Sequence, residues 1–292
     1  MESAISRVQR TSRQKRNRHR IVKLVSRDLD ILLALAKMRL ARTSDLARLF
    51  FGAIGTAQKR LRRLFDLGLV RAVVTDLAAE NRYAITKIGH RFLEEARPGE
   101  IPVWRPTPRT DGRSLAHLDL LNRYRVALAL GAQALGVNLA RFVPEWELRS
   151  IDPMARIIPD AALLLEVHGR WVEIALEVDT GTEPSSTLKK KVRAYNEARD
   201  AGMSVSGMHA PELLFLARST RRAHAIARAI SDDFPTAWVG HETSVRSDGG
   251  LVVGVSRAGD LSRAGRGEAA FGGGLLRGGD RTGSARHVRE PV

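Results

Sequence analysis

Three carboxylate side chains, spaced around two aliphatic runs, are the residues of this chain best suited to chemistry. Asp160 precedes the run at 161–167, and Glu177 and Asp179 lie at the end of the run that begins at residue 171. Carboxylate oxygens are the ligands that Mg²⁺ prefers in proteins. If the two runs fold against each other so that these side chains converge, the sequence predicts a site for a divalent cation.

A two-residue turn is expected between the runs, where His168 and Gly169 separate them. The hairpin built around this turn places Asp160 directly opposite Glu177, with Cβ atoms about 4.5–5.5 Å apart. Asp179 is two residues further along the strand and points to the same side. Like charges that face each other across a strand pair cost stability, and a bound cation is the simplest compensation.

The opposite face of the expected hairpin is apolar throughout. Burial of that face sets the register, because a one-residue slip would move every apolar side chain to the wrong side. The residues of this face are Leu163, Leu165, Val167, Val172, Ile174, Leu176 and Val178.

A lysine follows the acidic residues on a helix expected to begin near Ser185. An apolar stripe at spacings of four and three indicates the buried side of this helix, and it consists of Leu188, Val192 and Tyr195. Lys191 lies within the angular range of the stripe, whereas Lys189 and Lys190 point away from it. Lys191 is therefore placed to reach the carboxylates or a phosphate. A solvated acidic rim is the alternative interpretation of the three carboxylates.

Several motifs lie around these residues: the stretches at 158–161 and 176–183, the positions Lys191, Val192 and Tyr195, and a helix containing His117, Leu118 and Asn122. Together they resemble the replication-relaxation family of mobile-element proteins. The resemblance covers residues 25–240, approximately, and the C-terminal half is similar to the PD-(D/E)XK nuclease-like fold. It implies a role in replication or DNA relaxation of a plasmid or integrated element. For an active nuclease of this kind, Mg²⁺ held by Asp160, Glu177 and Asp179 would act with assistance from Lys191.

One departure from the nuclease pattern leaves catalysis open. Nucleases of this fold carry lysine where this chain has Asp179, so activity would depend on Lys191 as a migrated lysine, or the domain is a retired nuclease scaffold. The alternative function is a non-catalytic transcription or replication accessory factor. Its second domain would then serve as a homodimerisation module or as a surface for replication proteins. A structural partner of a conjugation relaxase is a third possibility.

Positive charge is concentrated in the first third of the chain. The 292 residues carry a formal charge of +16. Residues 1–97 hold 22 Lys/Arg and 9 Asp/Glu, whereas residues 98–292 hold 26 and 23. Such asymmetry favours a polyanionic partner for the N-terminal third. A membrane surface is the competing partner, but no apolar run of transmembrane length is present, so double-stranded DNA is favoured.

The chain contains no cysteine, which excludes disulfides and thiolate zinc sites. This composition is consistent with a reducing cytoplasm, and the basic start lacks the apolar segment of a secretion signal. A transit peptide is a weaker alternative for that start.

The order of elements in residues 27–97 predicts a winged helix. Helices are expected at 28–40, near 43–50 and at 56–67, with Ser26 as the first N-cap and Gly68 as the final stop. Strands at 70–74 and 83–85 then form the wing. The third helix of such a domain enters the major groove. The residues expected to contact DNA are Lys59, Arg60, Arg62, Arg63 and Arg82, although a charged helix face is also found simply facing solvent.

The remaining sequence predicts an α/β architecture, α+β overall. Residues 1–26 are expected to form a basic flexible arm, 98–113 a linker, 114–243 the PD-(D/E)XK nuclease-like mixed-sheet domain, and 244–292 a disordered Gly/Arg-rich tail. The domain would contain a helix at 115–135, strands at 142–148, 213–217 and 238–239, and a helix at 221–230. A lone histidine at the start of a helix is usually structural, and a role at the site is the alternative interpretation of His117. Glu145 or Glu147 is a candidate for a further carboxylate at the site.

Overall fold

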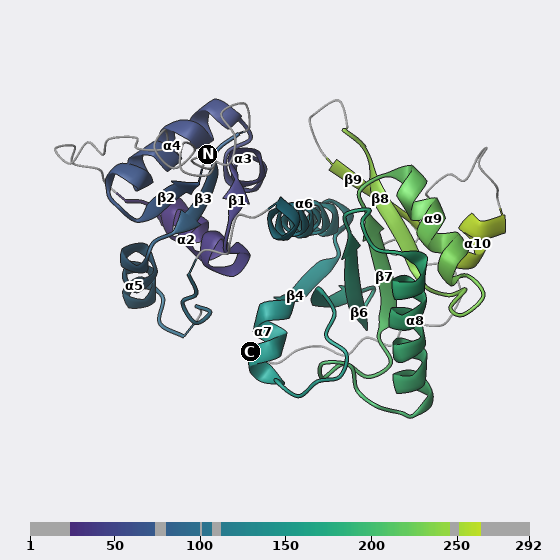
Figure 1. The fold of residues 1–292 in the computed structure, drawn as a ribbon. Helices are drawn as coiled ribbons and strands as arrows, with labels where there is room; N and C mark the ends of the chain where they lie inside the picture. The colour runs from purple at the N-terminus through teal and green to yellow at the C-terminus, as the bar shows by residue number, and fades with distance from the viewer. Residues whose placement is uncertain (1–23, 74–79, 100, 107–111, 246–250, 264–292) are drawn as a thin grey trace, which may run out of the picture.

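The computed structural model describes residues 24–73, 80–99, 101–106, 112–245 and 251–263. Two parts follow each other along the chain, an N-terminal part of short helices with a small sheet and a C-terminal part with a larger sheet (Figure 1). The fold is α+β, as the sequence predicts. Within the described residues, no helix has the length and apolar character needed to cross a membrane.

The N-terminal part has the topology of a winged helix. Its three-stranded antiparallel sheet has the order β1-β3-β2. Its elements are α2 (Ser26–Met38), β1 (Ala41–Arg42), α3 (Thr43–Phe50), α4 (Ile54–Asp66), β2 (Val70–Val73), β3 (Arg82–Ile85) and α5 (Lys87–Ala96). Residues 74–79, between the two strands of the wing, and residues 1–23 of the expected arm lie outside the described residues.

The ends of these helices follow local chemistry, with one correction. Val25, and not Ser26, is the N-cap of α2, because the Asp28 carboxylate accepts a hydrogen bond from the Val25 amide at 2.8 Å and takes the capping role. Gly68 follows the end of α4 with φ +77°, and its amide donates to the Phe65 carbonyl. This left-handed residue ends the helix, as the sequence predicts.

The C-terminal part is built on a six-stranded mixed sheet of order β4-β5-β6-β7-β8-β9. The β6–β7 and β7–β8 pairs are parallel, and the other pairs are antiparallel. The strands are β4 (Asn138–Pro144), β5 (Ala161–Val167), β6 (Arg170–Asp179), β7 (Glu212–Ala217), β8 (Trp238–Val245) and β9 (Leu251–Arg257). The helices are α6 (Gly112–Leu135), α7 (Glu145–Ile151), α8 (Ser185–Asp200), α9 (Thr220–Ile230) and α10 (Ala258–Arg263).

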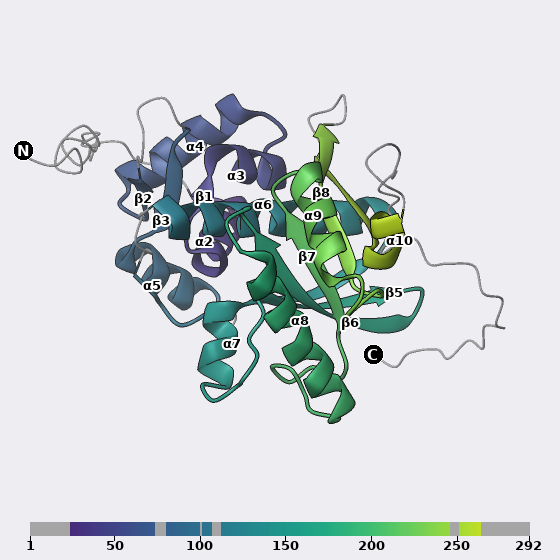
Figure 2. The same ribbon diagram turned by 45° about the vertical axis from the view of Figure 1, so that its right-hand side comes forward.

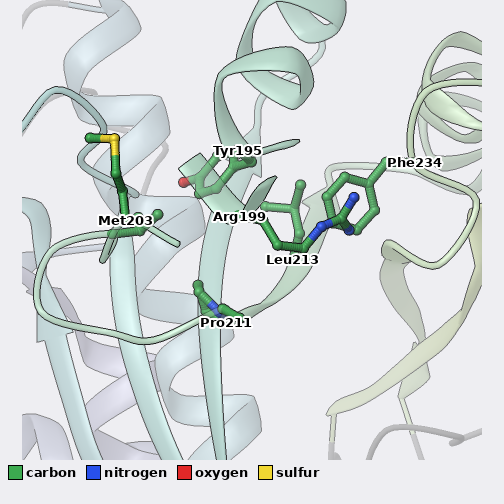
Figure 3. A pocket seen from close by; sticks show the side chains of 8 residues that line it. Tyr195, Arg199, Met203, Pro211, Leu213 and Phe234 are labelled. Atoms are coloured by element: carbon green, nitrogen blue, oxygen red, sulfur yellow. The ribbon is translucent and has the colours of Figure 1, made fainter. Parts of the chain in front are cut away.

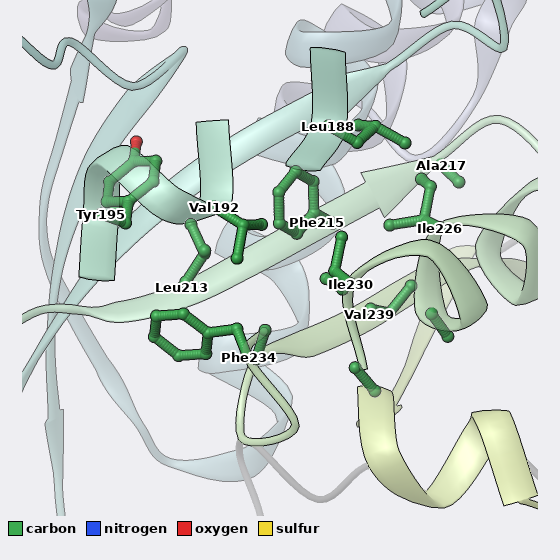
Figure 4. Packing of buried hydrophobic residues seen from close by; sticks show 14 of the residues in the cluster. Leu188, Val192, Tyr195, Leu213, Phe215, Ala217, Ile226, Ile230, Phe234 and Val239 are labelled. Atoms are coloured by element: carbon green, nitrogen blue, oxygen red, sulfur yellow. The ribbon is translucent and has the colours of Figure 1, made fainter. Parts of the chain in front are cut away.

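Helices cover both faces of this sheet. On one face α6 packs against the apolar side of β5 and β6, with Leu121 and Tyr124 among the buried residues. On the other face α8, α9 and α10 share a second core, in which Val192, Phe215 and Ile226 meet between helix and strand (Figure 4). Figure 2 shows α8 and α9 lying side by side over the strands.

The hairpin register is confirmed. Val167 pairs with Arg170 and Ala161 with Leu176, as the two-residue turn requires. His168 and Gly169 have φ values of 50° and 73°, and positive φ at both central residues is the signature of a type I′ turn.

Three predicted elements have wrong boundaries. The strand expected at 238–239 extends to Val245 as β8. The strand expected at 142–148 ends at Pro144, where α7 begins, because proline at the N-cap and Glu145 and Glu147 in the first turn favour a helix start. The tail expected from residue 244 is wrong for 251–263, which form β9 and α10, and Ala258 and Leu261 are buried in the core. Residues 264–292 lie outside the described residues.

Substitution of Gly89 tests the packing of α5. A Cβ at this position would lie 2.1 Å from the Leu69 carbonyl oxygen, which is backbone and has little room to move. We expect Gly89→Ala to lower the free energy of unfolding by about 1–3 kcal/mol, measured by urea denaturation.

Gly131→Ala in α6 is the matched control, because a Cβ there meets no atom within 4 Å. We expect it to raise stability by about 0.5–1 kcal/mol. Equal effects of the two substitutions would contradict the packing described for α5.

Candidate functional site

The acidic residues of the hairpin lie beneath the N-terminal half of α8. Glu177 and Asp179 are on the face of β6 that α8 covers, and their residues are only 4% and 2% exposed. Asp160 immediately precedes β5, where its Oδ2 accepts a hydrogen bond from the Val178 amide at 2.7 Å. The structure therefore brings the predicted carboxylates to one region, as the register requires.

Glu177 is held by two side chains of α8. Lys191 Nζ lies 3.0 Å from Oε2, and the Tyr195 hydroxyl donates to Oε1 at 2.8 Å. Burial raises the pKa of Glu177 to about 7, with a further contribution from the nearby Asp160 carboxylate. Lys191 also pairs with Glu183 at 3.0 Å. Burial acts to lower the pKa of Lys191, but its attraction and hydrogen bonds to the two glutamates more than offset this and raise it.

The negative charge of Asp179 is balanced by an arginine of α9, the helix that follows β7. Arg222 Nη2 lies 2.6 Å from Asp179 Oδ2, and the Gly181 amide donates to Oδ1. Arg222 is on α9, and Ser219, which caps that helix by accepting from the Arg222 amide, helps to position it. Because β6 and β7 are parallel, the start of α9 lies at the same sheet edge as Asp179.

His117 belongs to this cluster. It projects from α6, and its Nε2 lies 3.2 Å from Asp160 Oδ2. Burial acts to lower the pKa of His117, but hydrogen bonding and attraction to Asp160, with a smaller contribution from Glu145, raise it. A positively charged imidazole is thereby favoured beside Asp160.

A groove adjoins the cluster and lies between the two parts of the chain. Its volume is about 420 Å³, which is within the range of small-ligand sites. Its walls include Arg39 from the winged helix, His117 from α6, Glu145 and Trp146 from α7, and Asp160 and Thr182 near the sheet edge. Glu145, a predicted further carboxylate, therefore borders the groove. Glu147 is not among the lining residues, and it interacts electrostatically with Arg125.

A second pocket, bordered by the far end of α8, is too small for a ligand of this size. Its volume is about 10 Å³, room for about one water molecule, and Arg199, Met203 and Phe234 are among its walls (Figure 3).

The carboxylates as arranged do not fit a divalent metal. Both Glu177 oxygens accept hydrogen bonds from α8, and both Asp179 oxygens accept from Gly181 and Arg222. Lys191 and Arg222 already supply the positive charge that a cation would bring. Among the described residues, no group of three or more His, Cys, Asp or Glu side chains is arranged to hold a metal ion.

The residues predicted to contact DNA divide into two groups. Lys59 is exposed on the outer face of α4, with Arg62 and Arg63 half-buried beside it, and Arg62 also pairs with Asp66 at 3.1 Å. Arg60 instead forms an ion pair with the buried Asp28 of α2.

The Arg82 side chain is directed toward α6 and away from the surface of the wing. It is paired with Asp119 of α6 at 2.6 Å, and its side chain is 10% exposed. Asp119 also pairs with Arg42 at 2.8 Å, so one carboxylate of α6 holds two arginines of the small sheet.

Residues 32–208 match a family model described as replication-relaxation. The match runs from α2 through the winged helix, the acidic hairpin and α8, and it spans more than half of the chain. The chain belongs to the replication-relaxation family. Membership covers both the winged helix and the acidic cluster, which confirms the resemblance seen in the sequence.

Comparison with other proteins adds little to the family assignment. No curated protein matches the chain. A solved structure of Lactococcus lactis ZitR, a cysteine-to-serine mutant in complex with DNA, is similar at 16% identity over 32% of this chain and 66% of that chain, with a TM-score of 0.23. At that TM-score the likeness supports no conclusion about this member of the replication-relaxation family.

Three partners of the acidic cluster were not predicted from the sequence. Tyr195 was detectable, because it lies four residues after Lys191 on the same side of the helix. Glu183 lies in the turn before α8, where no periodic pattern indicates the direction of its side chain. No pattern in the sequence near Arg222 indicates its contact with Asp179, because Arg222 is on α9, after the next strand of the sheet.

The ion pair between His117 and Asp160 gives a pH-dependent signal. Because the folded pKa of His117 is raised, the stabilisation is present below pH 6.5, approximately, and is lost as the pH rises through the folded value. In an NMR titration of the imidazole, we expect Asp160→Asn to lower the pKa of His117.

The exposed Asp152 provides the control, and Asp152→Asn should leave the titration of His117 unchanged. His117→Gln identifies the resonance. The pKa of Glu177 is also raised, so its contribution to stability also falls as the pH rises. The His117 resonance separates the two groups, whereas a measurement of stability against pH would not. An unchanged midpoint in Asp160→Asn would show that the pair does not form.

Proposed function

We propose that this protein binds duplex DNA through its winged helix and acts in replication or DNA relaxation of a plasmid or integrated element. The observation that carries this proposal is the outer face of α4, where Lys59 is exposed and Arg62 and Arg63 flank it on the third helix of a winged-helix topology. The third helix is the one that enters the major groove in winged-helix domains. Family membership supports the link to replication.

The net charge of the first third supports the same conclusion. Residues 1–97 carry 22 basic and 9 acidic residues, which favours a polyanion over a neutral partner. Arg60 and Arg82 contribute to this charge, but their contacts with Asp28 and Asp119 give them a part in holding the fold.

In this proposal the second domain is a module linked to the winged helix, and the acidic cluster is part of its internal framework. Glu177 and Asp179 are paired with Lys191 and Arg222 inside the domain, an arrangement that satisfies the charges without a ligand. A non-catalytic replication or transcription accessory factor, whose second domain serves as a homodimerisation or partner module, agrees best with this arrangement.

Metal-dependent cleavage of DNA by a PD-(D/E)XK-like site is the second candidate. The mutual proximity of Asp160 and Glu177, which contributes to the raised pKa of Glu177, is the observation in its favour. Cleavage would require Lys191 and Tyr195 to release the Glu177 carboxylate first, because both oxygens are occupied.

DNA binding should depend on salt and on α4. In fluorescence anisotropy with a duplex, we expect a linear fall of log K with log salt concentration, because bound phosphates release counterions. Lys59→Ala and Arg63→Ala should each weaken binding and reduce the slope by about 0.9, if each side chain contacts one phosphate.

Arg149→Ala serves as the charge-matched control for α4. Arg149 is on α7, its side chain is 59% exposed, and it pairs with Glu145. Binding by wild-type protein that is absent, or that does not respond to salt, would contradict the proposed function.

A plasmid assay separates the two candidates. With Mg²⁺ or Mn²⁺, we expect supercoiled plasmid to remain intact in the presence of wild-type protein, because the carboxylates are already neutralised. Nicking or linearisation that disappears in Asp160→Ala and in Glu177→Ala, with DNA binding retained, would establish the second candidate instead. Glu173→Ala, on the same strand but away from the cluster, controls for loss of an acid.

A further inference from the structure

Helices α8 and α9 carry the positive charge of the second domain. Together they hold eight Lys/Arg and two Asp/Glu, whereas the rest of residues 98–292 holds 18 and 21. The remainder of the domain is therefore slightly acidic, and the excess of basic residues is confined to two neighbouring helices.

Apart from Arg199, which pairs with Asp200 at 3.5 Å, the basic residues of these helices divide into inner and outer groups. Lys191 and Arg222 point toward the sheet and are paired with Glu177 and Asp179. The outer group is exposed, and none of its members forms an ion pair with any residue that the structure describes. Three lie on α8, one precedes the N-cap of α9 and two lie on α9: Lys189, Lys190, Arg193, Arg218, Arg221 and Arg228.

The outer group forms one surface. Both helices pack on the same face of the sheet, so their outer sides face solvent next to each other (Figure 2). Both also begin at the same sheet edge, since each follows one of the parallel strands β6 and β7. The positive ends of two helix dipoles add to the field of the side chains there. The two acids, Glu197 and Asp200, lie in the C-terminal half of α8.

The chemistry of this surface favours a phosphate backbone. Lysine and arginine without interleaved aromatic residues suit phosphate contacts, and not base stacking. A helix that lies in a membrane surface carries large apolar side chains on the face opposite its cations. Among the described residues, none of the exposed large hydrophobic side chains lies on α8 or α9.

We propose that the outer faces of α8 and α9 form a second DNA-contact surface, which binds the duplex backbone without reading sequence. This inference rests on the proposed DNA binding by the winged helix and extends it. The winged helix contributes groove contacts, and α8 and α9 contribute phosphate contacts from the other domain. The protein then covers more DNA than a winged helix alone.

The test uses the full-length protein and a duplex of about 40 base pairs, which is several helical turns long. The variant Lys189→Ala/Lys190→Ala/Arg193→Ala removes three exposed cations from α8. We expect its affinity to fall roughly tenfold or more at moderate salt, and the slope of log K against log salt to decrease by about 0.9 for each phosphate that is no longer neutralised.

The matched control removes three exposed arginines that lie outside α8 and α9 in the same domain. Arg141→Ala/Arg156→Ala/Arg170→Ala changes β4, the loop before β5 and the first residue of β6, and lowers the net charge equally. We expect the control to keep the wild-type slope. An equal loss of affinity in both triple variants would overturn the proposal, since net charge alone would then explain binding.

Lysine acetylation of the wild-type protein provides a readout that does not depend on the folding of a variant. Mass spectrometry with and without DNA should show protection of Lys189 and Lys190 as well as Lys59. Protection of Lys59 alone, or an unchanged slope in the α8 variant, overturns the second surface and leaves the winged-helix function standing. Wild-type protein that binds no DNA overturns both. Capture of an acidic protein by this surface in place of DNA, with no DNA protection, also refutes the inference.

Discussion

The packing of α6 on both parts of the chain is the constraint on which the other features depend. Toward the large sheet, the helix buries Leu121 and Tyr124. Toward the winged helix, Asp119 holds two arginines, and the Asn122 amide donates to the Leu40 carbonyl at 2.6 Å. Removing one partner of a buried ion pair costs about 3–5 kcal/mol, because the remaining charge is left buried without a partner, so the orientation of the helix is tied to that of the small sheet. The small sheet and the acidic cluster are thereby held to a common element, which also carries His117.

Charge balance inside the second domain follows from burial. Carboxylates removed from water need partners, and here α6, α8 and α9 each supply one: His117, Lys191 and Arg222. The arrangement resembles a ligand site in its residue types but is already satisfied by the protein. The cations on the outer sides of α8 and α9 are exposed to water and need no partner within the fold. They are therefore available to a partner outside the chain.

Much of the architecture could be predicted, because it rests on short-range patterns. The hairpin register follows from a two-residue turn and strict alternation, and the stripe through Leu188 and Val192 places Lys191 correctly. The failures have equally local causes. Pro144 favoured a helix start that a strand interpretation overlooked, and the glycine-rich composition concealed the strand at 251–257 and the helix after it. The missed α5 carries a Thr86 N-cap that a closer search of the sequence could have found.

The sequence by itself determined the winged-helix order, the uneven charge, and the convergence of Asp160, Glu177 and Lys191, because periodicity and turn geometry act between near neighbours. Only the tertiary structure decided which charges are used within the fold. Arg82 and Asp119 are 37 residues apart, and Arg222 and Asp179 are 43 apart. No local pattern encodes such pairs, since they depend on how the helices dock onto the sheets. That docking separates the cations that neutralise buried acids from those left facing solvent.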